Sequence, residues 1–473
     1  MAVDFLVYDI VFLVIFVIFL FIFLHSGKKN LKREGLLLLY KTSWGIKLIN
    51  KIGKKNPGVF KVLSYVSIAT GYLLMALMIY MLAKIVHIYI SAPEIVRAVK
   101  VPPIIPLVPY LPQIFSLDFL PPFYFTYWIV IIAVIAITHE FSHGIFAAYN
   151  NLKIKTTGFG FFPWFLPVFL AAFVELDEKK MEKKKNFPQL AILSAGTFAN
   201  VLTAIFFFVV IWIFFFAAFT PSGVIFNTYP YSVVDISSIS SVNGIQVGEP
   251  TYEKISELLN VDGLNKVEAN GIAYVTTKDI SYREGIVVLY YDAPAINANL
   301  ESVIFGVNGV NVKSVNELSS ELSKYSPGEK ITLKVLGEDG EGYDIDIVLG
   351  KNPINENLAW LGIGFTNQER DSTLGKLFLL LSFKDPNIYY EAKFDGLSVF
   401  IYNLLWWVVL ISVSVALINM LPVGIFDGGR FFYLTVLGIT KSEKIAKLAF
   451  SLSTYAILFI LFLLLFFWAI AFI

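Results

Sequence analysis

Long apolar segments separated by short polar ones run through most of the chain, and this pattern predicts helices that cross a membrane. A helix needs about 20 consecutive apolar residues to span a hydrocarbon core about 30 Å thick. Residues 5–24 meet this length as one continuous apolar run, and similar stretches recur to the end of the sequence. The predicted spans are 5–24, about 62–86, 123–149, 189–218, a region from 397 to 440 broken at Pro422 and Gly424, and 448–472. We therefore expect an α-helical polytopic membrane protein with about six transmembrane helices.

One long segment, residues 220–395, has the composition of a water-soluble domain. Short runs rich in β-branched and aromatic residues alternate there with Asn-Gly and Pro-Gly turns, a pattern typical of antiparallel strands. The predicted strands are 285–291, 303–307, 331–335 and 343–349, and a short helix is predicted at 314–324. The Val-Asn-Gly sequence at 242–244 recurs at 307–309, which leaves a duplicated module open. We expect a mixed α/β region inserted between the fourth and fifth spans.

The composition agrees with a membrane location and excludes several kinds of site. Of the 473 residues, 57% are hydrophobic and 15% are charged, whereas soluble proteins are nearer half and a quarter. The formal net charge of +1 gives no indication of a nucleic-acid partner. The absence of cysteine excludes thiolate nucleophiles, disulfides and cysteine-ligated metals. Only four histidines are present, so few residues can take part in an imidazole metal site.

Lysine and arginine are concentrated in particular loops, and this distribution predicts the orientation. The first basic stretch follows the first span instead of preceding it, which is the reverse of a signal peptide. Residues 28–61 are rich in lysine, as cytoplasmic loops are, whereas the proline-rich segment 87–122 holds few cations. We therefore expect the N-terminus outside the cell and residues 220–395 outside as well. The last turn, which contains Lys441, Lys444 and Lys447, is expected in the cytoplasm.

The third predicted span contains a His-Glu-x-x-His pattern. His139 and His143 are four residues apart, so they share one face of a helix about 6 Å apart along its axis. Two imidazoles in this arrangement can bind one Zn²⁺, and Glu140 can act as general base on a water that zinc activates. Ionisable side chains inside a span are costly when they face lipid, which favours a functional interpretation. The alternative is an internal, hydrogen-bonded polar cluster.

A catalytic zinc needs a third protein ligand. His25 and His87 are expected at opposite membrane surfaces, so the third ligand should be a carboxylate. Acidic residues are almost absent from the apolar runs, and Asp427 is the notable exception. Pro422 and Gly424 break the helix before it and would let Asp427 bend toward the metal. The alternative is that Asp427 caps a helix or forms a turn.

Asn200 is a further polar residue, near the cytoplasmic end of the fourth span, and it follows the small residues that begin at Gly196. Two interpretations stay open. The small residues can permit close helix packing. Alternatively, the amide of Asn200 can bind an unwound substrate backbone or an oxyanion.

These motifs resemble those of the site-2 protease family of intramembrane zinc metalloproteases, of the archaeal or bacterial type with a PDZ-like insert. The resemblance rests on residues 139–144, 196–200 and 419–429, the last with Asn, Pro and Asp-Gly-Gly at the family's spacing. It implies that a transmembrane helix of another protein is the substrate and that one catalytic Zn²⁺ is the cofactor. The site residues that it implies are the zinc ligands His139, His143 and Asp427 and the general base Glu140.

The same resemblance implies roles for residues around the metal. Asn200 and Asn419 would bind the extended substrate strand, and residues 159–174 would form a membrane-associated strand loop near the site. Within the insert, about 285–350 is similar to a PDZ domain, and about 222–282 would be a degenerate second copy. A clear carboxylate-binding loop is missing, so a structural spacer is an equal alternative.

The expected domain organisation places a catalytic membrane core on both sides of the insert. Its parts are two N-terminal transmembrane helices with a basic loop (1–86), an outer loop (87–122), the first half of the core (123–218), the extracytoplasmic region (220–395), the second half of the core (396–440) and a C-terminal helix (441–473).

Three other functions compete with a site-2 type protease. A prenyl-protein type metalloprotease would take its third ligand from a later glutamate helix, and Asp427 argues against it. A zinc transporter would show repeated polar sites along a pathway. A catalytically inactive scaffold acting through the PDZ-like region is the main alternative. The sequence does not determine the substrate or the oligomeric state.

Overall fold

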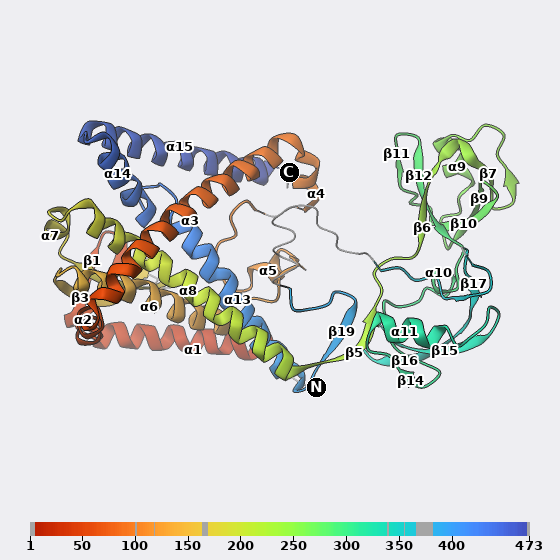
Figure 1. Ribbon diagram of the computed structural model, residues 1–473, viewed down its shortest axis with the longest axis horizontal. Coiled ribbons are helices and arrows are strands. Elements are labelled where there is room, and N and C mark those ends of the chain that lie inside the picture. Colours follow the sequence, from red (N-terminus) through yellow and green to blue (C-terminus); the bar gives the residue numbers. More distant parts are fainter. Residues whose placement is uncertain are drawn as a thin grey trace. The chain divides into compact units, whose positions relative to one another are not determined.

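The computed structural model describes residues 5–99, 102–117, 119–162, 169–337, 340–353, 355–365 and 382–470. The chain divides into two compact units, one made of Met1–Phe214 with Val399–Ile473 and the other of Phe215–Ser398. Long helices dominate the first unit and strands dominate the second (Figure 1).

Six helices among the described residues are long and apolar enough to cross a membrane. They are α1 (Phe5–Ser26), α3 (Pro57–Ser91), α6 (Phe125–Tyr149), α8 (Asn186–Ala218), α13 (Asp395–Asn419) and α15 (Glu443–Ile470). Large apolar side chains face outward on them, for example Leu452, Phe459 and Phe462 of α15, which are 62%, 60% and 63% exposed. Such a surface suits lipid, where a helix satisfies its own backbone groups. The chain is therefore a helical membrane protein with a β-rich insert.

The region expected to break near Pro422 forms a helix, a turn and a second helix. α13 ends at Asn419, and α14 (Asp427–Thr440) begins directly at the candidate ligand. The turn folds back on the start of α14, so added Cβ atoms at Gly428 and Gly429 would each lie 2.4 Å from backbone carbonyl oxygens of the turn. Only glycine fits at these two positions, which explains the Asp-Gly-Gly sequence.

A four-stranded antiparallel sheet covers one end of the helical unit. Its strands, in spatial order, are β1 (Leu31–Glu34), β2 (Leu37–Thr42), β3 (Ile154–Phe162) and β4 (Phe169–Leu176). The basic segment 28–61, predicted to be a cytoplasmic loop between the first two spans, contains β1 and β2, two strands that the sequence did not predict. The sequence gives little sign of them because β2 is completed by pairing with β3, more than 100 residues away, as Thr42 opposite Thr157 shows. The prolines at 163 and 167 lie outside the described residues.

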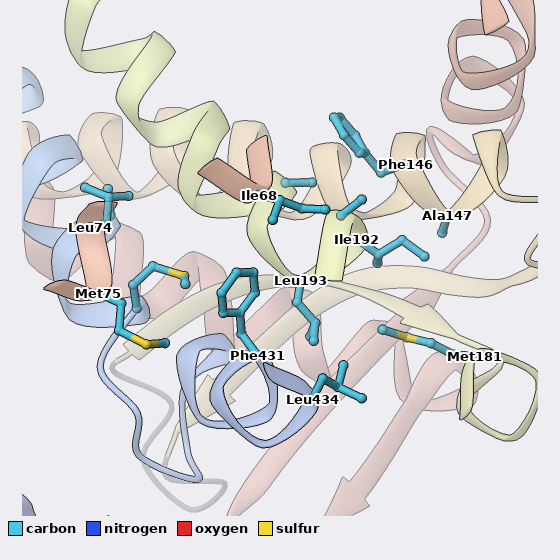
Figure 2. Close-up of a cluster of buried hydrophobic side chains, with 14 of the residues drawn as sticks. Ile68, Leu74, Met75, Phe146, Ala147, Met181, Ile192, Leu193, Phe431 and Leu434 are labelled. Atoms are coloured by element: carbon cyan, nitrogen blue, oxygen red, sulfur yellow. The ribbon is translucent and has the colours of Figure 1, made fainter. Parts of the chain in front are cut away.

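Apolar side chains from six helices, including Ala416 and Leu417 of α13, form the core around which the site is built. Figure 2 shows side chains of α3, α6, α8, α14 and the short helix α7 (Glu178–Glu182) meeting in this cluster. Phe431 and Ala147 in it are 0% exposed. Because these helices carry or flank the candidate ligands, their packing fixes the relative positions of those ligands.

Asp9 corrects the interpretation of residues 5–24 as a continuous apolar run. Its side chain lies within α1, is 1% exposed, and accepts hydrogen bonds from the backbone N–H groups of Phe125 at 2.7 Å and Thr126 at 2.9 Å. The hydroxyl of Tyr110 also donates to it, at 2.7 Å. A carboxylate is favourable at a helix N-terminus, where backbone N–H groups lack partners. Asp9 thus anchors the start of α6 to α1.

Further short helices connect the elements of this unit. They are α2 (Ile46–Lys55), α4 (Pro93–Val99), α5 (Leu111–Ile114) and the 3₁₀ turn η1 (Lys28–Asn30). α4 and α5 lie in the segment that was predicted as an outer loop and not helical throughout.

The described residues of the insert form two large antiparallel sheets and one pair of short strands. The first has the order β11-β12-β10-β9-β7-β8, with β6 paired to β12. Its strands are β6 (Tyr231–Asp235), β7 (Ile239–Val242), β8 (Ile245–Gln246), β9 (Asn265–Ala269), β10 (Ile272–Thr276), β11 (Tyr282–Arg283) and β12 (Ile286–Tyr291), accompanied by η2 (Ile236–Ser238) and α9 (Tyr252–Leu258). β12 therefore pairs within the first sheet, whereas the predicted boundary near 285 places it in the second module.

The second sheet has the order β16-β15-β13-β5-β19, with β14 paired to β13. Its strands are β5 (Phe219–Ile225), β13 (Val303–Val307), β14 (Val310–Asn311), β15 (Lys330–Leu336), β16 (Gly342–Val348) and β19 (Ile388–Ala392). Beside it lie α10 (Pro294–Asn297), α11 (Val315–Leu322) and the strand pair β17 (Gly350–Lys351) and β18 (Ala359–Trp360). This sheet extends beyond the predicted range 285–350, because β5 and β19 come from the two ends of the insert.

The repeated Val-Asn-Gly sequence forms the same turn in both sheets. Asn243 and Gly244 have φ values of 52° and 80°, and Asn308 and Gly309 have φ values of 47° and 79°. Two consecutive positive φ values define the hairpin turn for which Asn-Gly is preferred. In both turns the asparagine Oδ1 accepts a backbone N–H from a neighbouring strand, at Lys266 and at Thr332. The two halves of the insert thus share a hairpin followed by a short helix.

Candidate metal centre

The two histidines of α6 present the same ring nitrogen to one point. His139 and His143 are 8% and 9% exposed, and their Nε2 atoms are 3.0 Å apart. They come from one helical face, as the spacing of four residues predicted. Two donor atoms this close in a buried site are suited to sharing one cation.

Asp427 completes a group of three candidate ligands. Its Oδ2 atom lies 3.3 Å from Nε2 of His139 and 3.2 Å from Nε2 of His143. Ligands about 2.0–2.2 Å from one zinc ion at tetrahedral angles lie roughly 3.3–3.5 Å apart. The spacing and the chemistry of the donors therefore fit zinc. Asp427 reaches this point as the first residue of α14, so the helix break before it sets its position.

The Nδ1 atom of each imidazole also has a hydrogen-bond partner, and this partner determines that Nε2 is the nitrogen free to bind a metal. Nδ1 of His143 lies 2.7 Å from the carbonyl oxygen of Ile192, which can only accept a hydrogen bond. Nδ1 of His143 therefore carries the proton, and Nε2 has a free lone pair. Nδ1 of His139 lies 3.0 Å from the side-chain amide of Asn200.

The amide of Asn200 supports the same tautomer for His139. Asn200 is 0% exposed, and among the described residues its Oδ1 atom has no hydrogen-bond partner while Nδ2 faces the ring. Amide oxygen and nitrogen exchange places when the group rotates by 180°, and the hydrogen-bond network decides between them. With Oδ1 toward His139, the amide accepts the Nδ1 proton and leaves Nε2 for the metal. This is the usual arrangement of a residue that orients a metal-ligating histidine.

Gly196 closes one side of the site. A Cβ atom added at this residue of α8 would lie 2.4 Å from Nε2 of His143 and 2.6 Å from Nε2 of His139. The backbone of α8 therefore approaches the ligand atoms as closely as a glycine allows. The sequence pattern connects Gly196 with helix packing but not with the metal site.

Glu140 lies beside the ligands and contacts strand β4. Its Oε2 atom accepts the backbone N–H of Val174 at 3.1 Å. β4 is the last strand of its sheet, so this N–H points away from β3 and toward α6. The edge of the sheet is thus turned toward the candidate general base.

A cavity of about 740 Å³ connects these residues. His139, Glu140, His143 and Asp427 line it, together with Asn419 at the end of α13. Apolar residues of α6 and α13 and charged residues of β4, α7 and α14 also line it. They include Ile131, Ile132, Ile135, Ile411 and Val415, and Glu175, Glu178 and Arg430. Asn200, by contrast, lies behind His139 and does not line the cavity.

Comparison with known families agrees with this geometry. The model of peptidase family M50 matches residues 127–464, which is well over half of the chain. The chain belongs to this family. The matched region contains all three candidate ligands and Glu140, as well as the whole insert.

Individual relatives of this M50 chain have low sequence identity to it. It is 28% identical over 185 residues to the zinc metalloprotease RasP of Shouchella clausii (strain KSM-K16), a match that covers 33% of the chain and 43% of RasP. The chain thus spans less than half the length of that relative. It is also 24% identical over 344 residues to a protein of Clostridium perfringens (strain 13 / Type A) that is provisionally named a zinc metalloprotease, covering 68% of the chain and 91% of that protein.

Proposed function

We propose that this M50 peptidase is an intramembrane zinc metalloendopeptidase that hydrolyses peptide bonds within or near transmembrane helices of other membrane proteins. The observation that carries the proposal is the convergence of three ligand atoms, Nε2 of His139, Nε2 of His143 and Oδ2 of Asp427, within 4.8 Å of one another in a helical membrane unit. Glu140 lines the same cavity. A metal site with a neighbouring carboxylate is the minimum set for zinc-dependent hydrolysis.

The residues around the ligands have separate tasks in this proposal. When bound, zinc supplies a Lewis acid that polarises the scissile carbonyl and lowers the pKa of a water. Glu140 takes the proton from the attacking water and passes it to the leaving amine. Ile192 and Asn200 hold the two imidazoles in the tautomer that leaves Nε2 free. Asn200 is therefore proposed as a positioning residue, because burial behind His139 separates it from the cavity.

Strand β4 offers a way to present a helical substrate for cleavage. A helix in lipid has every carbonyl hydrogen-bonded within itself, so the scissile segment must unwind before it reacts. The N–H of Val174 lies on the edge of β4 that has no strand beside it among the described residues, where it donates to Glu140. Ala172 shares that direction because alternate residues of a strand face the same neighbour. An extended segment can pair with this edge beside Glu140. Asn419 lines the cavity and would offer its amide to the same segment.

We further propose the orientation that the charge distribution predicts. The site lies in the last three turns of α6, and the lysine-rich residues 28–61 adjoin that end of the helix. Positively charged loops favour the cytoplasm. The N-terminus and the insert would then lie outside the cell, and the insert would act as a PDZ-like region that limits access by bulky substrates. The repeated Asn-Gly hairpins support a duplicated module there.

A cleavage assay tests the proposal. The purified full-length protein is reconstituted in vesicles with a single-span substrate that contains helix-destabilising residues, with and without a zinc chelator. We expect cleavage near the substrate helix, its loss with the chelator and its return with added zinc. Binding of the substrate without cleavage under every zinc condition would instead favour the inactive scaffold.

A further inference from the structure

Helix α2 is in direct contact with α6, the helix that carries the site. It ends at Lys55, directly before the predicted span α3 begins at Pro57, so it lies close to one end of that span. Ile49 of α2 is 0% exposed and packs on Gly144, where an added Cβ would lie 3.0 Å from its Cγ2 atom. A Cβ at Gly53 would lie 2.5 Å from the carbonyl oxygen of Ile145. Glycine at both contact points lets the two helices pack closely, next to His143.

The outward face of α2 is divided into a basic strip and an apolar strip. Successive residues of a helix are 100° apart, so Lys47, Lys51 and Lys54 fall together on one flank, and Leu48 and Ile52 fall on the other. All three lysines are exposed, and Leu48 and Ile52 are 52% and 38% exposed. A helix with such a face lies in the plane of a membrane interface, with its apolar flank in the acyl region and its basic flank toward the headgroups.

The lysines are available for an external partner. Among the residues that the structure describes, no acidic side chain forms an ion pair with Lys47, Lys51 or Lys54. By contrast, Lys41, which lies just before α2 in β2, is paired with Glu175 at 2.9 Å. Clustered cations beside a membrane attract anionic lipid.

The start of α2 also contacts the site motif. Gly45, with φ of 81°, packs so closely on Phe141 that an added Cβ would lie 2.7 Å from its ring. The ring of Trp44, which is 61% exposed, lies with its centroid 5.6 Å from that of Phe141. Phe141 is the neighbour of Glu140. The start of α2 therefore contacts the turn of α6 that bears the candidate base.

We propose that α2 is a binding site for anionic phospholipid headgroups and that occupancy of this site sets the activity of the enzyme. The binding part of the proposal depends only on α2, whereas the activity part rests on the proposed proteolysis. Lipid bound to the basic strip would hold α2 in the interface and against α6. Loss of this lipid would allow α2 to move, and Phe141 and Glu140 would move with it.

A matched pair of triple variants tests this site. One variant carries Lys47→Gln, Lys51→Gln and Lys54→Gln. The control carries Lys441→Gln, Lys444→Gln and Lys447→Gln, which remove the same charge from the end of α14 and the start of α15. Native mass spectrometry of the full chain measures binding of phosphatidylglycerol against phosphatidylcholine, and elemental analysis of zinc checks that the metal centre remains intact.

We expect the α2 variant to bind phosphatidylglycerol about tenfold or more weakly, because each lysine near an anionic surface contributes to attraction, while the control keeps its binding. In vesicles, phosphatidylglycerol should raise cleavage by the unmodified protein and by the control but not by the α2 variant. Equal loss of phosphatidylglycerol binding in both variants would show that any lysine cluster on the surface attracts this lipid, and it would refute a specific site on α2. If the α2 variant loses lipid binding but cleaves substrate as the unmodified protein does, the proposal that the lipid sets the activity is refuted. Absence of cleavage by every protein, with lipid binding as expected, would contradict the proposed proteolysis and leave the lipid site standing.

Discussion

Substitution of Gly196 by alanine probes the close approach of α8 to the metal centre. The added methyl carbon would lie 2.4 Å from Nε2 of His143 and 2.6 Å from Nε2 of His139. Non-bonded carbon and nitrogen atoms rarely approach within about 3.4 Å, so the overlap is roughly 1 Å. The two rings or α8 must move to relieve it, and overpacking of this kind costs about 1–3 kcal/mol. Because the displaced atoms are the ligands, most of this cost should appear in metal affinity.

The expected consequence is a zinc affinity lower by roughly 5- to 150-fold, since about 1.4 kcal/mol corresponds to a factor of ten. Competition with a chromophoric zinc chelator on the purified protein measures this affinity. Gly438→Ala is the matched control, because an added Cβ there has its nearest neighbour at 3.4 Å, the Nδ2 atom of Asn186. If Gly196→Ala binds zinc as tightly as the control, the rings do not converge where the structure places them and the metal centre as described is refuted.

Three further substitutions separate catalysis, metal positioning and stability. Glu140→Gln should retain zinc but lose cleavage, because the amide cannot accept the proton from water; cleavage at the normal rate in a substrate assay would remove Glu140 as the base. Asn200→Ala should lower zinc affinity about 10- to 100-fold through loss of the partner of His139 Nδ1, as measured by chelator competition. Unchanged affinity would assign Asn200 to packing alone. Asp9→Asn should lower the free energy of unfolding by about 1.5–3 kcal/mol, because a charged acceptor for Phe125 and Thr126 is replaced by a neutral one. An unchanged thermal midpoint in detergent would contradict the anchoring role of Asp9.

The membrane helices and the ligand set could be predicted because their signals are local or very unusual. Apolar runs of spanning length are rare outside membrane helices. His139, His143 and Asp427 stood out because ionisable residues are rare in such runs. The sequence could therefore suggest that they meet, although only the structure gives the 3.2–3.3 Å between the aspartate and the imidazoles.

Other features depended on contacts that the sequence does not express. β1 and β2 lie in a basic segment, where β1 pairs with β2 and β2 is completed by pairing with β3. The role of Gly196 depends on which groups lie against the α8 backbone at this position. A glycine in the sequence does not indicate what those groups are. Asp9 did carry a signal, an acidic residue in an apolar span, but its partners Tyr110 and Phe125 are more than 100 residues away. Non-local contacts account for each of these omissions.

The zinc content of the purified protein and of its Asp427→Asn variant tests the central claim most directly. Elemental analysis after removal of loosely bound metal should find about one zinc per chain in the unmodified protein, as three protein ligands predict. Asp427→Asn should retain far less, because its neutral amide is a poor replacement for the carboxylate ligand. Equal zinc content in the two proteins, or none in the unmodified protein after exposure to zinc, would contradict the proposal that His139, His143 and Asp427 hold a catalytic metal.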